Sequence, residues 1–309
     1  MNKPAIYYPL TRLPNFRGKI RVLRMLHNLL GLGGKHVEVD ARLTRPVSYR
    51  MLLDLHSKHE LMAYLMSEYE ANATRFLVSV YDGNGYFLDV GANIGLISIP
   101  FALMTETAGP APAVAPMPIY CVEPIRSNYD SLRRNVSRNG LNERINTLCL
   151  GLGEEQKRVD IQVEDNLKDG AGTGTANILA EGSEYECERI PLQITTVDFL
   201  VASAQLPPHC SLIKLDTDGY DLFVLKGAAK MLAGARPIIF GEFMAHCLRW
   251  HGQTVDDVKH FMESLGYVVF FKQIREWRFD REMPMADFVS DLLLLPDERV
   301  HEFRWCCDG

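Results

Sequence analysis

The chain lacks the features that mark membrane-spanning, secreted and disulfide-stabilised proteins. No apolar run is long enough to cross a bilayer, so we expect no stable membrane insertion. The first residues do not show the charged, apolar and small-residue order of a signal peptide. The seven cysteines include no CxxC pair and one adjacent pair, Cys306 and Cys307. This usage predicts reduced thiols in the cytoplasm, and its spacing calls for no metal site.

An excess of positive charge is also absent. The 309 residues carry a formal net charge of -6, which argues against a broad basic surface and so against a nucleic-acid partner. The composition is 47% hydrophobic and 23% charged, as in ordinary globular proteins. A chain of this length and composition can bury a sizeable core.

The sequence pattern changes at about Gly85. We predict an N-terminal α/β extension over residues 1–84 and a main domain over residues 85–309. In the extension, residues 16–30 show the period of a basic amphipathic helix. Packing of this helix on the core is the preferred interpretation, and docking on a membrane surface or a partner is the alternative. Short strands are predicted within residues 36–55 and a single helix over residues 59–80.

The main domain alternates strands with helices, which predicts a doubly wound α/β fold with a mostly parallel sheet. The predicted strands are residues 86–90, 119–122, 146–150, 212–215, 237–240, 267–272 and 291–295. The predicted helices are residues 94–104, 127–139, 222–232 and 254–265, the last opened by a Thr-x-x-Asp capping pattern. We expect the last two strands to form an antiparallel pair at an edge of the sheet.

Two segments interrupt this order. Residues 105–118 are rich in Ala and Pro and predict a surface insertion. Residues 165–182 are rich in Gly and predict either a flexible connection or a lid over a ligand.

The segment LDVGANIG, residues 88–95, lies where a buried strand turns into a helix. Gly91 and Gly95 would let the backbone approach a ligand closely, although a turn without a ligand also explains them. Such a turn lies at the topological switch point, where open α/β sheets bind ligands. Glu123 directly follows the second strand, from which a carboxylate can accept hydrogen bonds from both hydroxyls of a ribose.

The charge of this turn favours a cationic nucleoside over a dinucleotide as its ligand. A dinucleotide fingerprint would be G-x-G-x-x-G, with backbone amides around a pyrophosphate. Here Asp89 and Asn93 replace the first two glycines. A carboxylate repels a pyrophosphate but suits the cationic sulfonium and amino groups of S-adenosylmethionine (SAM). We therefore predict SAM as the cofactor.

Several separated motifs resemble the FkbM family of SAM-dependent methyltransferases. They are DVGANIG at residues 89–95, VEP at 122–124, TTVDFL at 195–200, IKLDTDGYDLFVLKGA at 213–228 and IIFGEF at 238–243. The match covers roughly residues 86–296 and departs from the family at Asp218, where the family usually has Glu. The resemblance implies a class I, Rossmann-like methyltransferase fold with a seven-stranded sheet, mostly parallel with an antiparallel last strand. It also implies O-methylation of a sugar, a glycan or a secondary metabolite.

The predicted cofactor-binding residues lie in the first two of these motifs. They are Asp89, Gly91, Ala92, Asn93, Gly95, Glu123 and Pro124.

Candidates for the transfer chemistry follow the fourth and fifth buried strands of the main domain. Methyl transfer to an alcohol needs an aligned acceptor oxygen and a group that removes its proton. Asp216, Asp218 and Glu242 should converge on one cleft, with His246 as a further candidate base. Acceptor binding, metal binding and helix capping are the open roles for the three carboxylates. Lys214 lies on the same side of its strand as Asp216 and either pairs with a carboxylate or reaches solvent.

Other assignments stay open at this stage. Tyr220, Trp250 and Trp277 are interpreted as packing or surface residues, with stacking on an acceptor as the alternative. The leading hypothesis is an O-methyltransferase for a small-molecule or glycan acceptor. The alternatives are a nicotinamide-dependent oxidoreductase and a SAM-binding protein without turnover. Self-association is compatible with each of them.

Overall fold

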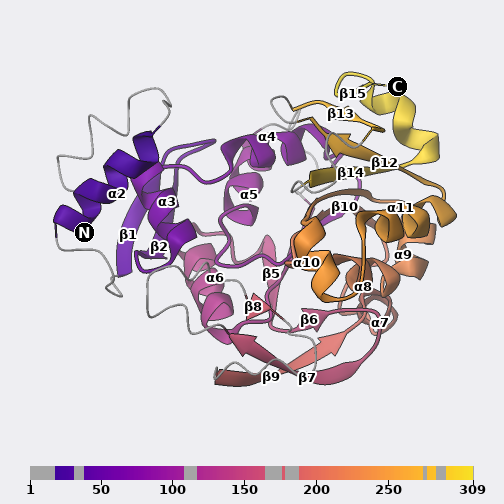
Figure 1. The fold of residues 1–309 in the computed structure, drawn as a ribbon, viewed down its shortest axis with the longest axis horizontal. Helices are drawn as coiled ribbons and strands as arrows, with labels where there is room; N and C mark the ends of the chain where they lie inside the picture. The colour runs from indigo at the N-terminus through magenta and orange to yellow at the C-terminus, as the bar shows by residue number, and fades with distance from the viewer. Residues whose placement is uncertain are drawn as a thin grey trace.

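The computed structural model describes residues 18–30, 38–107, 117–163, 176–177, 188–273, 277–282 and 290–308. Figure 1 shows helices around a central sheet, with the N-terminal elements on one side of the molecule and a small second sheet at its lower edge.

The central sheet runs through the core. Across it, the order of the described strands is β15, β13, β12, β14, β11, β10, β3, β4 and β5. Their bounds are β15 Cys307–Asp308, β13 Phe279–Asp280, β12 Tyr267–Lys272, β14 Ser290–Pro296, β11 Ile238–Phe243, β10 Cys210–Leu215, β3 Tyr86–Val90, β4 Ile119–Val122 and β5 Ile145–Leu148. The five strands from β11 to β5 pair in parallel, and β14 runs antiparallel to both β11 and β12. The predicted α/β fold with a mostly parallel sheet is confirmed.

The antiparallel strand does not lie where a hairpin at the edge would put it. β14 is inserted between β11 and β12, so β12 is the outer strand of the pair. Two short strands, β13 and β15, then extend the seven expected strands beyond β12. Every residue of β3 and β10 is buried, which is why their apolar runs were recognisable in the sequence.

The described helices are α2 Lys19–Leu29, α3 Lys58–Met66, α4 Ala71–Val80, α5 Ser98–Thr107, α6 Arg126–Arg138, α7 Val197–Ala202, α8 Asp221–Lys226, α9 Ala229–Ala235, α10 Ala245–Trp250, α11 Val255–Ser264 and the 3₁₀ helix η2 Asp297–Phe303. The capping pattern before α11 is confirmed, because Thr254 and Asp257 form a reciprocal capping box. The short helix α10 was not predicted.

Three predicted helices have different bounds for local reasons. The helix over residues 59–80 is two helices, because Ser67 and Glu70 adopt left-handed backbone between them. The helix after β3 begins at Ser98 rather than residue 94, since Asn93 and Gly95 are also left-handed. The helix over residues 222–232 is divided into α8 and α9. There Asp198 accepts hydrogen bonds from the backbone of Lys230 and Met231 in the first turn of α9.

The second sheet was not predicted. Its strand order is β6 (Gly151–Leu152), β9 (Glu188–Thr195), β7 (Lys157–Val163) and β8 (Ala176–Asn177). Of the glycine-rich segment 165–182, only β8 belongs to the described residues, and residues 108–116 of the predicted insertion also lie outside them.

The N-terminal elements share one apolar core with the central sheet. The predicted strands are β1 (Glu38–Leu43) and β2 (Tyr49–Asp54), which form an antiparallel pair. Leu23 of α2, Met51 of β2 and Leu77 of α4 belong to the same buried cluster as Phe87 and Ile119 of the sheet. The predicted helix over residues 16–30 is observed as α2, which packs Leu23 into this core.

Two asparagines, Asn135 in α6 and Asn139 at its C-cap, cover the free edge of β2. Asn139 accepts a hydrogen bond from the Arg50 N–H at 2.9 Å and donates to the Arg50 carbonyl at 2.7 Å. One helical turn earlier, Asn135 accepts from the Leu52 N–H at 2.7 Å and donates to the Leu52 carbonyl at 3.4 Å. The fully buried Asn135 amide also donates to the carbonyl of Ile94 at 3.1 Å. The two side chains thus take the place of a neighbouring strand and join the extension to the turn after β3.

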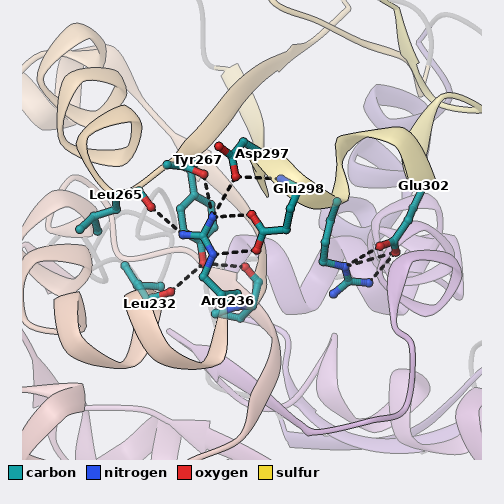
Figure 2. A network of polar contacts seen from close by, with 10 residues as sticks. Leu232, Arg236, Leu265, Tyr267, Asp297, Glu298 and Glu302 are labelled. Atoms are coloured by element: carbon teal, nitrogen blue, oxygen red, sulfur yellow. Dashed lines mark hydrogen bonds and ion pairs between the residues drawn. The ribbon is translucent and has the colours of Figure 1, made fainter.

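Arg236 ties together the carboxyl-terminal part of the fold, as Figure 2 shows. It ends α9 in left-handed backbone and donates to the carbonyls of Leu265 and Gly266 at 2.6 and 2.8 Å. Its guanidinium makes a two-point contact with Glu298, at 2.9 and 2.7 Å, and lies over the Tyr267 ring. These contacts hold α11, β12 and η2 against one another.

No helix within the described ranges is long and apolar enough to span a bilayer.

We predict that Asn135→Ala destabilises the protein by about 2–4 kcal/mol. The change leaves the Leu52 N–H and the Ile94 carbonyl without their partner, and an unsatisfied buried polar group costs about 1–3 kcal/mol. Urea unfolding of wild type and variant measures the difference, with the exposed Ser137→Ala on the same helix as the control. A loss below about 0.5 kcal/mol, the range of ordinary surface substitutions, would show that these hydrogen bonds are dispensable.

Candidate active site

The turn after β3 is held against the end of β4. The backbone N–H groups of Gly91 and Ala92 both donate to the Val122 carbonyl at 3.0 Å. Asn93 follows with a φ of 50°, a conformation that asparagine tolerates better than most residues. Its N–H donates to Oε2 of Glu123 at 2.9 Å, so the turn and the glutamate are in direct contact.

The two glycines of the turn lie against protein atoms. A Cβ on Gly91 would lie 1.9 Å from the carbonyl oxygen of Asp216, and one on Gly95 would lie 2.9 Å from the Leu132 side chain. Both residues also have positive φ, 76° and 92°. Packing inside the protein therefore requires these glycines, and their contact with a cofactor stays a prediction.

Glu123 ends β4 almost completely buried, with 4% of its surface exposed. Besides Asn93, its carboxylate accepts from the Ile125 N–H at 2.9 Å and from the Asn128 amide at 3.4 Å. Burial raises the pKa of Glu123 to about 7, although these donors oppose the shift. Pro124 lies half-buried between Glu123 and Ile125.

Lys214 on β10 joins the ends of two strands. Its ammonium lies 3.2 Å from Oδ1 of Asp89 and 3.3 Å from Oδ2 of Asp216, and it donates to the Gly91 carbonyl at 2.9 Å. Burial lowers the pKa of Lys214, but the charges of Asp89 and Asp216 outweigh it and the net shift is upward. Of the two alternatives for Lys214, the structure shows pairing. Asp89 itself is fully buried and also accepts a hydrogen bond from Ser98.

A cavity of about 700 Å³ opens next to Lys214 and Asp216. Its lining comes from β10, β11, β14 and the start of α4, together with residues 45, 68, 272 and 277. The polar and aromatic lining residues are Arg45, Glu68, Glu70, Asn72, Arg75, Lys214, Asp216, Phe240, Glu242, Lys272, Trp277 and Asp291. The structure therefore brings Asp216 and Glu242 to one cavity, together with carboxylates that were not predicted.

Burial and repulsion by neighbouring carboxylates raise the pKa of two of the predicted residues, Glu242 and Asp218. Burial raises the pKa of Glu242 to about 8, helped by the charges of Asp216 and Asp291. Burial also raises the pKa of Asp218 to about 7, again with a contribution from Asp216. Asp218 has left-handed backbone, φ 50°, and lies inside the turn that Asp221 holds by accepting from the N–H groups of Thr217 and Gly219.

His246 is separate from the cavity lining. It is exposed on α10, 3.4 Å from the Cys247 sulfur and with its ring against Trp250. Of the three aromatic candidates, Trp277 lines the cavity, Tyr220 is buried and Trp250 is 48% exposed on α10.

Two charged pairs in the lining were missed because their partners are far apart in the sequence. Arg45 lies 3.4 Å from Glu68, and Lys272 pairs with Asp291. The Lys272 ammonium also lies 4.1 Å from the centre of the Trp277 ring. The clue in the sequence was the position of Asp291 at the start of a predicted strand. Within the described ranges no three His, Cys, Asp or Glu side chains are arranged to hold a metal ion.

Comparison with solved structures gives matches with low sequence identity. The FkbM methyltransferase from Methylobacillus flagellatus KT is 17% identical, with 76% of this chain and 52% of that chain covered and a TM-score of 0.42. Precorrin-6y C5,15-methyltransferase from Geobacter metallireducens GS-15 is 11% identical, covering 73% of this chain and 88% of that one with a TM-score of 0.40. Cofactor-bound Rv0187 from MTB is 13% identical, covering 74% and 81% with a TM-score of 0.42.

The present chain spans about half the length of the Methylobacillus protein. No curated protein matches it significantly. The strand order of its sheet is that of a class I SAM methyltransferase, with β14 as the antiparallel strand.

The family model for the FkbM methyltransferase domain matches residues 89–269, which is more than half of the chain. The matched region begins at the buried Asp89 and includes β10, β11 and every predicted site residue. The protein belongs to the FkbM methyltransferase family.

Proposed function

We propose that the protein transfers a methyl group from SAM to a hydroxyl group of a sugar, a glycan or another polyhydroxylated small molecule. The observation that supports this most directly is the cavity beside the Lys214 ion pairs. Asp216 and Glu242 line this cavity, and Lys214, which also lines it, donates to the Gly91 carbonyl of the turn that we propose to hold the methyl donor.

The charges around the turn suit SAM. Asp89, Glu123, Asp216 and Asp218 are acidic, and Lys214 is already neutralised by two carboxylates. Such surroundings favour the sulfonium and ammonium groups of SAM and disfavour a pyrophosphate. In the proposal, Glu123 accepts hydrogen bonds from the ribose, while Gly91, Ala92, Asn93, Gly95 and Pro124 shape the backbone around the nucleoside. When bound, SAM supplies an electrophilic methyl group.

In this proposal Asp89 supports the turn indirectly, through Lys214, and does not contact the cofactor. Its carboxylate is fully buried between Lys214 and Ser98, so it fixes the ammonium that in turn holds the Gly91 carbonyl. The residue is therefore proposed to organise the cofactor site through Lys214.

The acceptor is proposed to lie in the cavity. Carboxylates accept hydrogen bonds from hydroxyl groups, so Asp216 and Glu242 would orient the acceptor, with Asp218 beside them. The Trp277 ring is fixed by Phe76 and Phe240, 5.5 and 6.0 Å between ring centres, and offers an apolar platform opposite these polar groups. His246 keeps the role of a candidate base on α10, outside the lining.

Further features of the proposal rest on sequence and composition. A cytoplasmic location is proposed from the free cysteines, six of which occur among the described residues. The net charge of -6 supports a small-molecule or glycan acceptor rather than a nucleic acid. We retain two further proposals. The extension meets the methyltransferase domain at about residue 85, and the chain can form an oligomer.

We predict micromolar binding of SAM and of its demethylated product by isothermal titration. Asp89→Asn and Glu123→Gln should each weaken SAM binding about 10–100-fold, because a hydrogen bond to a charged group contributes about 1.5–3 kcal/mol. The exposed Glu143→Gln serves as the control. Absence of heat with both ligands, in protein shown to be folded, would contradict the proposed cofactor.

We predict that Trp277→Ala raises KM for a glycoside acceptor about 2–12-fold and changes kcat little, since an aromatic contact contributes about 0.5–1.5 kcal/mol beyond its buried area. Methyl transfer to a panel of methyl glycosides, with radiolabelled SAM, measures both constants. Trp305→Ala, at a residue that is 55% exposed, is the matched control. A variant that lost kcat with an unchanged KM would place Trp277 outside the acceptor site.

We predict that Glu242→Gln raises the melting temperature at pH 9 and leaves it nearly unchanged at pH 4, below the unfolded pKa. The folded-state pKa of about 8 lies above the ordinary 4.5, so the folded protein binds this proton more tightly and loses stability as pH rises through this range. The gain should be on the order of 1–2 kcal/mol after solvent screening, or about 3–5 °C. The exposed Glu263→Gln is the control, and an equal gain at both pH values would contradict the assigned shift.

A further inference from the structure

The cavity beside Lys214 has a buried floor and an exposed rim. Lys214 of β10 and Phe240 of β11 are buried at the floor. Asn72 and Arg75 of α4 are exposed at the rim. The Lys214 ammonium also holds the Gly91 carbonyl of the turn that we propose to bind SAM. A hydroxyl group that receives the methyl group therefore has to lie toward the floor, and the rest of the acceptor extends toward the rim.

The cations of the lining differ in whether the protein itself neutralises them. Among the described residues, four lysines and arginines line the cavity. Three of them have a carboxylate partner in the same lining, namely Lys214 with Asp216, Lys272 with Asp291 and Arg45 with Glu68. Arg75 is the fourth, and no carboxylate of the described ranges lies within 4 Å of its guanidinium. Arg75 is therefore the cation of this lining that a ligand can pair with.

The Arg75 guanidinium is oriented by a neighbour on its own helix. Its Nη1 donates to Oδ1 of Asn72 at 3.1 Å, and both residues line the cavity. This bond uses one of the five N–H donors of the guanidinium, so the other four can contact an anion. A planar guanidinium matches the two oxygens of a carboxylate or a phosphate, to which it can donate two parallel hydrogen bonds.

The carboxylates of the lining do not cancel the charge of Arg75. Three of them pair with the other cations, as described above. Burial raises the pKa of Glu242 to about 8, so this residue carries its proton at neutral pH. Glu70 precedes the first turn of α4, and its carboxylate lies more than 4 Å from the Arg75 guanidinium. The rim at Arg75 therefore keeps a positive charge.

We propose that the acceptor carries an anionic group, a carboxylate or a phosphate, and that Arg75 binds this group at the rim of the cavity. This inference rests on the proposed function, and it narrows the acceptor from polyhydroxylated molecules in general to acidic ones such as uronic acids and sugar phosphates. Arg75 determines specificity, because it contacts the acceptor away from the reacting hydroxyl group and takes no part in the transfer. Its contribution therefore belongs to KM and not to kcat.

The first test measures acceptor binding in the absence of SAM, by isothermal titration with matched sets of methyl glycosides. Each set, built on glucose, galactose or mannose, keeps one ring and carries a hydroxymethyl, a carboxylate or a phosphate ester at C6. We expect an acidic member to bind about 5–13-fold more tightly than its neutral counterpart, between the values for an exposed ion pair and for a hydrogen bond to a charged group. The two acidic members distinguish carboxylate from phosphate, and added salt should reduce the preference. Equal affinity for the acidic and neutral members of every set overturns the proposal.

The second test assigns the preference to Arg75. Arg75→Gln should abolish it, and Arg75→Lys should keep a part of it, because lysine retains the charge without the planar fork. The exposed Arg133→Gln on α6 is the matched control and should bind like the wild type. In transfer assays with radiolabelled SAM, Arg75→Gln should raise KM for the acidic glycoside by the same factor and leave kcat and the KM of the neutral glycoside unchanged. A preference that survives Arg75→Gln, or a loss of kcat at unchanged KM, overturns the proposal.

Failure of this proposal and failure of the proposed function give different results. Methyl transfer to neutral glycosides that is not improved by an acidic group leaves the proposed function standing and overturns the role of Arg75. A wild type that does not bind SAM contradicts the proposed function, and the titrations without SAM then decide the role of Arg75 alone. A wild type that binds SAM but no member of any set contradicts both.

Discussion

The ion pairs of Lys214 are the interaction on which the site depends. One buried ammonium contacts Asp89 at the end of β3, Asp216 after β10 and the carbonyl of Gly91 in the turn. Removing a single partner would leave an uncompensated charge in the core, which is far more costly than losing a surface ion pair. The two central strands, the turn after β3 and the cavity wall are therefore fixed by the same group. The position of Gly91 against the Asp216 carbonyl adds a steric constraint to this electrostatic one.

The part of the fold that the sequence predicted is the part governed by local pattern. β3 and β10 are buried along their whole length, and α11 carries its capping residues in a short motif. The convergence of Asp216 and Glu242 also followed from the sequence, because the carboxyl ends of parallel strands meet at one edge. The resemblance to the FkbM family supported the prediction that the methyl donor is SAM.

What the sequence did not reveal was decided by contacts between distant segments. The break between α3 and α4 depends on left-handed backbone at Ser67 and Glu70, neither of which is a glycine. The small sheet pairs β7 with β9, and in both strands every second residue is apolar, so this alternation was present in the sequence and was overlooked. The position of β14 between β11 and β12 likewise follows from pairing on both of its edges.

The asparagines that cover β2 have a consequence for the order in which the molecule is made. Leu52 and Asn135 are 83 residues apart, so the hairpin leaves the ribosome well before its cover exists. At ~5–20 residues per second this interval is about 4–17 s. During that time the backbone of β2 is an open edge to which a nascent strand of another chain can add. The speed of translation across residues 52 to 139 thus affects folding, although the folded structure shows no trace of it. Slow translation there would favour aggregation of the unfinished chain.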